Sequence, residues 1–138
     1  MSKRTVTYEE FGELMCKLVS ELKYFNFHND RKFEVVFGEP RGAWPLVTHL
    51  SHYLDLKVCD SIADFYGLNC LVVDDICDTG KTFERIKKMN DMDKHPCKLY
   101  FASLFYKPTS NFKPDLYIEE TTQWVVFPWE KIDEQPNR

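Results

Sequence analysis

Length, composition and charge limit what kind of protein this chain can be. Its 138 residues are 43% hydrophobic and 15% aromatic, which is enough apolar material for one domain with its own core. The 18 basic and 22 acidic residues give a net charge of −4, which argues against a surface for nucleic acid or for an anionic membrane. We therefore expect a single domain over residues 1–138 that binds neither.

Cysteine usage and apolar runs indicate the compartment. The five cysteines are an odd number, and their spacing contains neither a CxxC pair nor a cysteine–histidine cluster of the zinc-binding type. The first ten residues, MSKRTVTYEE, lack the apolar stretch of a secretory signal. No apolar run approaches the roughly 18 residues of a membrane span. These features predict a soluble, cytoplasmic protein.

The N-terminal segment predicts a helix. Thr7 and Glu10 have the spacing of a capping box, in which each residue's side chain accepts a hydrogen bond from the other's backbone N–H. Apolar residues then recur at helical intervals as far as Leu22. We expect about four helical turns, ending before residues 26–30.

Strands and helices alternate through the rest of the chain. The expected strands cover residues 33–37, 56–59, 68–73, 99–105, 116–118 and 124–127. The expected helices cover residues 46–54 and 82–92. This alternation implies right-handed βαβ units and an α/β fold with a mostly parallel central sheet flanked by helices. Ligands bind such sheets at the carboxyl ends of the strands, so the loops after Phe37, Val73 and Phe105 are the expected site.

An acidic strand end carries the chain's most informative motif. Residues 71–83 read LVVDDICDTGKTF, and the second half has the form of an ATP-binding P-loop. A P-loop requires a glycine five positions before Gly80, and that position holds Asp75. The turn still opens a helix, whose free N–H groups and dipole attract anions. The adjacent Asp74 and Asp75 suit a sugar phosphate that carries cis-hydroxyls, and Mg²⁺ would offset the negative charge of such a ligand. Alternatively, the two residues belong to an acidic turn that only caps the helix.

Residues 72–82, VVDDICDTGKT, resemble the phosphoribosyl-pyrophosphate (PRPP) motif of type I phosphoribosyltransferases. The resemblance implies that family's fold, with a core over about residues 33–106, a small C-terminal hood over about residues 107–130 and a tail over residues 131–138. It also implies Mg²⁺ as cofactor, PRPP and a purine base as substrates, and a homodimer or homotetramer.

The same resemblance assigns roles within the motif. Asp74 and Asp75 would engage the ribose hydroxyls and, partly through the ligand, the Mg²⁺ ion. Asp78 would also accept the N7 proton of the purine as a general base. The residues implied in holding the 5′-phosphate are Asp78, Thr79, Gly80, Lys81 and Thr82.

The turn GEPRG resembles the family's pyrophosphate loop. On that basis Arg41, Gly42 and Ala43 would bind pyrophosphate, because a small residue lets the backbone approach the leaving group. Arg41 would alternatively face a neighbouring subunit. Read alone, the segment is equally consistent with an ordinary turn between a strand and a helix.

The C-terminal third of the sequence indicates the class of substrate. The segments FYKP and QWVVFPWE resemble the purine-binding end of bacterial and archaeal xanthine-guanine or hypoxanthine phosphoribosyltransferases. The resemblance implies that Lys107 donates to the purine O6, that Trp124 stacks on the base, and that the backbone at Val125 reads its edge. Taken singly, such a tryptophan is more often a core residue and such a lysine a solvated one.

Residues 58–69 depart from the family pattern, because they leave little room for the long flexible loop that closes over the active site. A shortened loop has three alternative consequences: a slower and leakier enzyme, a lid supplied by a neighbouring subunit, or a non-catalytic sensor that binds PRPP or a nucleotide. We expect a transferase for 6-oxopurines. The sensor is the main alternative. An adenine or pyrimidine transferase is a third, with Lys107 arguing against adenine.

Overall fold

The computed structural model describes residues 2–30, 32–61 and 67–130. Its strands are β1 (Lys3–Thr5), β2 (Val35–Phe37), β3 (Lys57–Val58), β4 (Asn69–Cys77), β5 (Lys98–Tyr106), β6 (Leu116–Glu120) and β7 (Trp124–Val126). Its helices are α1 (Tyr8–His28), α2 (Trp44–Leu54) and α3 (Lys81–Asp91). Within the described ranges, no helix has both the length and the apolar character that crossing a membrane requires.

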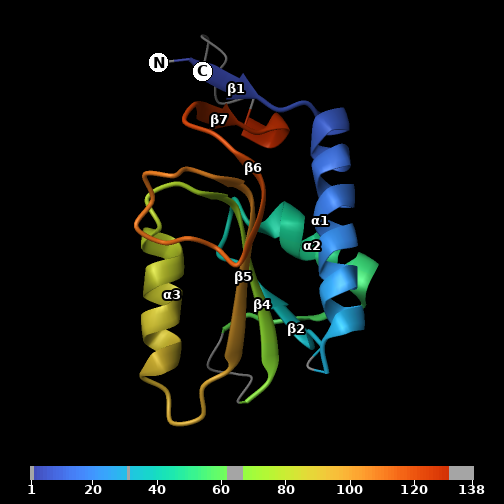
Figure 1. The fold of residues 1–138 in the computed structure, drawn as a ribbon, viewed down its shortest axis with the longest axis vertical. Coiled ribbons are helices and arrows are strands. Elements are labelled where there is room, and N and C mark those ends of the chain that lie inside the picture. Colours follow the sequence, from blue (N-terminus) through green and yellow to red (C-terminus); the bar gives the residue numbers. More distant parts are fainter. Residues whose placement is uncertain (1, 31, 62–66, 131–138) are drawn as a thin grey trace.

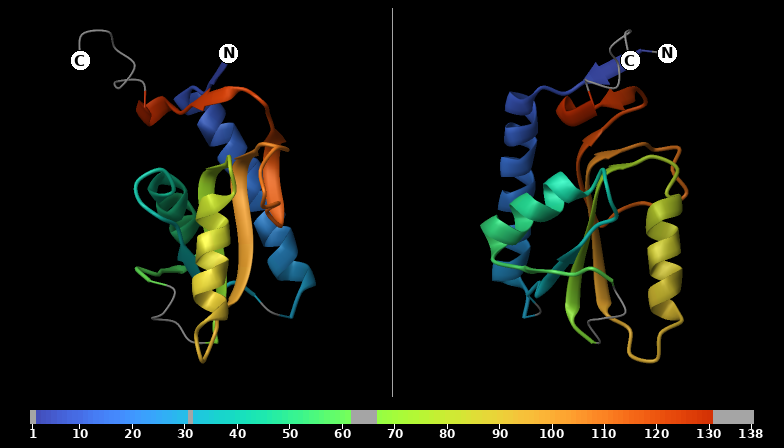
Figure 2. Two further views of the ribbon diagram at one scale, coloured as in Figure 1. Left: turned by 90° about the vertical axis from the view of Figure 1, so that its left-hand side faces the viewer. Right: turned by 180° about the vertical axis from the view of Figure 1, so that it is seen from behind.

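The predicted parallel α/β architecture is confirmed. Five strands form the main sheet in the order β3-β2-β4-β5-β6, and every neighbouring pair is parallel. Helices α1 and α2 lie on one face of this sheet and α3 lies on the other (Figures 1 and 2). Side chains of β2 and β4 alternate accordingly, so that Val36 and Leu71 join the core under α1 and α2 whereas Val35 and Val72 join the core under α3.

The capping box at the start of α1 is present as predicted. The Thr7 hydroxyl accepts a hydrogen bond from the Glu10 N–H at 3.0 Å, and the Glu10 carboxylate accepts one from the Thr7 N–H at 3.4 Å. The predicted end of the helix was wrong, because α1 continues to His28. Its last turn is held by tertiary contacts: the Phe25 ring stacks on Phe33, with ring centroids 4.8 Å apart.

Strand β4 is longer than expected and contains the acidic motif. The sequence predicts a strand ending at Val73, but pairing with β5 continues past that residue, and β4 ends at Cys77. Asp74 lies opposite Ser103 and Cys77 lies opposite Tyr106 in this extension. Both carboxylates of the motif therefore project from a hydrogen-bonded strand, which fixes their backbone.

The two ends of the described chain meet above the main sheet. Strand β1, which the sequence does not predict, pairs in parallel with β7 in a separate two-stranded sheet (Figure 1). Strand β6 lies within the predicted hood range but pairs with β5 in the main sheet. The division into a core over residues 33–106 and a hood over residues 107–130 stays a prediction. The shortened-loop segment, residues 58–69, lies partly outside the described residues, and the tail over residues 131–138 lies wholly outside them.

Candidate functional site

The loops that follow β2, β4 and β5 meet at the carboxyl edge of the sheet, where the strand order predicts a ligand site. The backbone N–H of Lys107, just after β5, donates to the Cys77 carbonyl at the end of β4, at 3.0 Å. The loop after β2 approaches the same strand, because a Cβ atom built on Gly42 would lie 2.7 Å from Asp75 Oδ2. The three sequence-predicted segments are thus brought together.

The acidic pair divides the site into two parts. Asp74 borders a small cavity of about 70 Å³ formed with the turn that follows β4. Asp75 borders a different cavity of about 340 Å³, together with Arg41 and Gly42. Consecutive strand residues point to opposite sides, so the two carboxylates serve two adjoining compartments, as the extended backbone predicts.

Crowding changes the protonation of this pair. Burial, reinforced by the charge of Asp75, raises the pKa of Asp74 from 3.8 to about 9. Burial also raises the pKa of Asp75. Each carboxylate accepts one hydrogen bond from the backbone. Asp74 Oδ1 accepts from the Asp75 N–H at 2.9 Å, and Asp75 Oδ1 accepts from the Ile76 N–H at 2.8 Å. Near neutral pH the pair therefore retains a proton, which an approaching cation would displace.

The turn between β4 and α3 has the form of an anion site. Helix α3 begins at Lys81 with Gly80 as its N-cap, so the N-cap residue has no side chain to accept from the first N–H groups. The Thr79 hydroxyl accepts one hydrogen bond, from the Lys81 N–H at 3.3 Å. The cavity of about 70 Å³ lies at this helix start and is bordered by the predicted phosphate-binding residues Asp78, Thr79, Gly80, Lys81 and Thr82. A phosphate group suits both the free donors and the helix dipole.

Gly80 is required by this geometry. Its φ of +89° lies in the left-handed region, and a Cβ atom there would meet the Phe112 backbone nitrogen at 2.7 Å. We expect Gly80→Ala to lower the free energy of unfolding by roughly 1–3 kcal/mol and to weaken phosphate binding. Urea denaturation measures the first effect. Gly12→Ala is the matched control, because no atom lies within 4 Å of a Cβ built at Gly12. Equal stability of the two variants would contradict this requirement.

Lys107 and Trp124, two of the three predicted purine-binding residues, form a cluster with the predicted general base Asp78. The Lys107 ammonium lies 3.3 Å from Asp78 Oδ1 and 5.7 Å from the centre of the Trp124 ring. The Lys107 side chain is only 12% exposed, whereas Trp124 is 52% exposed and leaves its ring accessible. Val125, by contrast, is buried in the core that faces α1 and α2. A planar base can approach the Trp124 ring with a carboxylate and an ammonium in reach.

The candidate pyrophosphate loop is a compact turn. The Ala43 N–H donates to the Glu39 carbonyl at 3.3 Å, and the Trp44 N–H donates to the Arg41 carbonyl at 3.1 Å. Ala43 is buried, whereas the Arg41 side chain is exposed. Gly42 faces Asp75 without room for a side chain, so the loop backbone itself lines the cavity.

Several residues of the site were not predicted to belong to it. The loop after β5 supports the phosphate turn, because the Asn111 N–H donates to the Thr79 carbonyl at 3.0 Å and the Ser110 hydroxyl donates to the Phe112 carbonyl at 2.8 Å. Trp129 and Glu130 border the Asp75 cavity from the C-terminal segment. The segment QWVVFPWE contains both residues, but only the structure brings them to Asp75.

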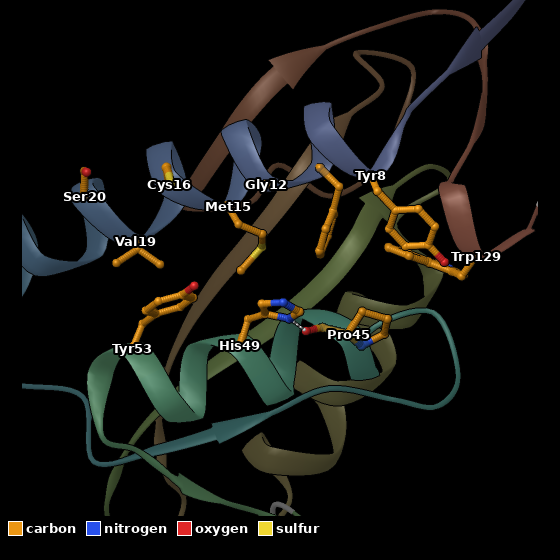
Figure 3. Close-up of a pocket in the computed structure, with 11 residues that line it drawn as sticks. Tyr8, Gly12, Met15, Cys16, Val19, Ser20, Pro45, His49, Tyr53 and Trp129 are labelled. Carbon is orange, nitrogen blue, oxygen red and sulfur yellow. Dashed lines mark hydrogen bonds between the residues drawn. The ribbon is translucent and has the colours of Figure 1, made fainter.

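A further cavity shares Trp129 with the Asp75 cavity but is not lined by the acidic pair. It measures about 640 Å³ and separates α1 from α2, with Met15, His49 and Tyr53 among its lining residues (Figure 3). His49 Nδ1 donates to the Pro45 carbonyl at 2.6 Å, which directs Nε2 away from its own helix backbone. This cavity contains none of the residues predicted for phosphate, pyrophosphate or base binding.

Comparison with known proteins agrees with this geometry. Residues 61–134 match the family model of the phosphoribosyl transferase domain. The chain is 36% identical over 124 residues to a xanthine-guanine phosphoribosyltransferase of Cereibacter sphaeroides, with 71% of this chain and 70% of the relative covered. A purine phosphoribosyltransferase of Pyrococcus horikoshii has a similar structure, with a TM-score of 0.76, 25% identity and 94% of each chain covered.

A further structure agrees in fold alone. The xanthine-guanine-hypoxanthine phosphoribosyltransferase of Helicobacter pylori aligns with a TM-score of 0.79 and 24% identity, over 99% of this chain and 100% of that one. The parallel sheet, the acidic strand end and the helix start beside it define an α/β protein for a phosphorylated ligand. Together with the family match and the relatives, they establish that the chain belongs to the phosphoribosyltransferase family.

Proposed function

We infer that this protein is a purine phosphoribosyltransferase, which transfers the 5-phosphoribosyl group of PRPP to a 6-oxopurine and releases pyrophosphate. The observation that carries the substrate assignment is the cluster in which Lys107 lies 3.3 Å from Asp78 and faces the exposed Trp124 ring. The xanthine-guanine relatives support the same base class. They do not favour a non-catalytic sensor.

We assign the substrate groups to the compartments of the site. The ribose hydroxyls would bind Asp74 and Asp75, and the pyrophosphate would bind Arg41, Gly42 and Ala43. The turn Asp78, Thr79, Gly80, Lys81 and Thr82 would hold the 5′-phosphate. Trp124 would stack on the base while Lys107 donates to its O6 and the Val125 backbone reads its edge.

In the proposed reaction, a bond forms between the purine N9 and the ribose C1′, and the bond from C1′ to the pyrophosphate oxygen breaks. Asp78 would accept the proton that leaves N7 of the base, and its position 3.3 Å from the Lys107 ammonium supports this role. The electron pair of the broken bond leaves with pyrophosphate, whose charge Arg41 and the loop N–H groups would stabilise.

The acidic pair is compatible with Mg²⁺ as cofactor. Among residues 2–30, 32–61 and 67–130, no group of three or more histidine, cysteine or acidic side chains forms a protein cage for a metal. Mg²⁺ commonly takes only one or two carboxylates and fills its octahedron with water and substrate phosphates. Asp74 and Asp75 would supply those carboxylates. When bound, the ion would offset the substrate's negative charge.

The proposal is tested by incubating the purified protein with PRPP and Mg²⁺ and each of guanine, xanthine, hypoxanthine and adenine. A nucleoside monophosphate formed from at least one 6-oxopurine is the expected result. PRPP binding in calorimetry without product from any base would instead establish a sensor. We also propose a homodimer or homotetramer in the cytoplasm, which light scattering and fractionation can test.

Base recognition by Lys107 has its own test. We expect Lys107→Ala to reduce the preference for a 6-oxopurine over adenine by about 10- to 100-fold, because a charged donor to O6 is lost. Competition between guanine and adenine at fixed PRPP measures this ratio. Lys113→Ala removes an exposed lysine from the same loop and serves as the matched control. An unchanged ratio in Lys107→Ala would show that another group reads O6.

A further inference from the structure

We propose that Arg85 of α3 binds the pyrophosphate group of PRPP, and that Glu39 holds Arg85 in place until the substrate arrives. This inference rests on the proposed function. It begins from an ion pair that no motif predicts: an Arg85 guanidinium nitrogen contacts Glu39 Oε1. Glu39 belongs to the same tight turn as Arg41 and Ala43, because its carbonyl accepts the Ala43 N–H.

The Arg85 side chain connects α3 to the loop after β2 through Glu39. Arg85 lies four residues after Lys81, so the two cations share one face of α3, and both border the same surface groove. Lys81 begins the helix at the 5′-phosphate turn, while the Arg85 head group reaches the loop after β2. A cation anchored on α3 thus lies against the loop proposed for pyrophosphate.

Charge explains why a further cation is useful here. The substrate brings several negative charges to a site that already contains Asp74, Asp75 and Asp78. The Lys107 ammonium already forms an ion pair with Asp78 Oδ1 at 3.3 Å. Glu39 adds another negative charge close to the pair, since it contributes to raising the pKa of Asp74. When a phosphate replaces Glu39 as the partner of Arg85, the guanidinium exchanges one anion for another. The guanidinium can bind that phosphate through two parallel hydrogen bonds.

Exposure makes this exchange feasible. The Arg85 side chain is 55% exposed, so it can change rotamer without disturbing the core, whereas Glu39 is 28% exposed. An ion pair at such exposure contributes little to stability. The interaction is therefore better suited to positioning a side chain than to holding the loop on the helix.

The decisive experiment compares two variants that remove the same ion pair. We expect Arg85→Gln to raise the KM for PRPP by about 3- to 10-fold, since a charge-assisted contact is lost. We expect Glu39→Gln to lower it by about 2- to 3-fold, because Arg85 no longer has a competing partner. Arg85→Lys should retain part of the affinity. The KM for the base should stay unchanged in all three variants.

Lys87→Gln is the matched control, because Lys87 is similarly exposed on α3 and forms a local ion pair with Asp91 at 3.1 Å. If the Glu39–Arg85 pair merely fastened the loop to the helix, Arg85→Gln and Glu39→Gln would change the KM for PRPP in the same direction. That result, or an Arg85→Gln variant that behaves like Lys87→Gln, would overturn the proposal.

Binding measurements separate this inference from the proposed function. Titration of Arg85→Gln with inorganic pyrophosphate and Mg²⁺ should show weaker binding, whereas titration with a purine nucleoside monophosphate should match the original protein. Equal weakening for both ligands would place Arg85 at the 5′-phosphate and refute the assignment. Neither titration requires turnover. If the protein has no transferase activity, the proposed function is refuted, but the titrations still test whether Arg85 binds pyrophosphate.

Discussion

Replacing Asp78 by asparagine is expected to lower turnover by about 10²- to 10⁴-fold, the range in which general-base catalysis contributes. The amide nearly preserves the shape of the carboxylate but cannot accept the N7 proton. Because the phosphate turn donates mainly through backbone N–H groups, PRPP affinity should change much less. Steady-state assays give kcat, and calorimetry gives the PRPP dissociation constant.

The control for Asp78→Asn is Asp91→Asn, which neutralises an exposed carboxylate at the end of α3. That change should leave both constants as they are. If Asp78→Asn reduced turnover and PRPP affinity by the same factor, Asp78 would be a binding residue. Its contact with Lys107 would then serve to orient the lysine.

Asp74→Asn is expected to affect stability and function in opposite directions. The variant should bind PRPP about 10- to 100-fold more weakly, because a charged acceptor for the ribose hydroxyls is lost. Yet it should be more stable without ligand at pH 8, by roughly 1–3 kcal/mol, because a crowded buried acid is removed. Calorimetry with PRPP and urea denaturation measure the two effects.

The pH dependence of that stability follows from the raised pKa. Asp74 has a pKa of about 9 in the folded protein, against 3.8 ordinarily. Between these values the folded state holds a proton that the unfolded state has lost, so the free energy of unfolding falls as the pH rises. The advantage of Asp74→Asn should therefore grow from about pH 4 to pH 9. An advantage that is constant with pH, or largest in acid, would contradict a raised pKa.

The fold was largely predictable because its patterns are local. Short apolar runs predicted the positions of strands β2 to β7, and the segments before and between them predicted all three helices. Strand β1 was missed, because Lys3–Thr5 carries no apolar run and is a strand only by pairing with β7. The ends of β4 and α1 were placed too early for a related reason: pairing with β5 and the Phe25–Phe33 contact extend them.

The sequence by itself determined the α/β class, the family and the order of the three site segments, because strand patterns and the acidic motif are contiguous in the chain. Only the tertiary structure decided which distant side chains meet there. Lys107 reaches Asp78, Gly42 faces Asp75 and Arg85 finds Glu39 across 46 residues of chain. Such contacts depend on strand order, register and helix placement, because only the folded sheet brings segments that are distant in the chain into contact.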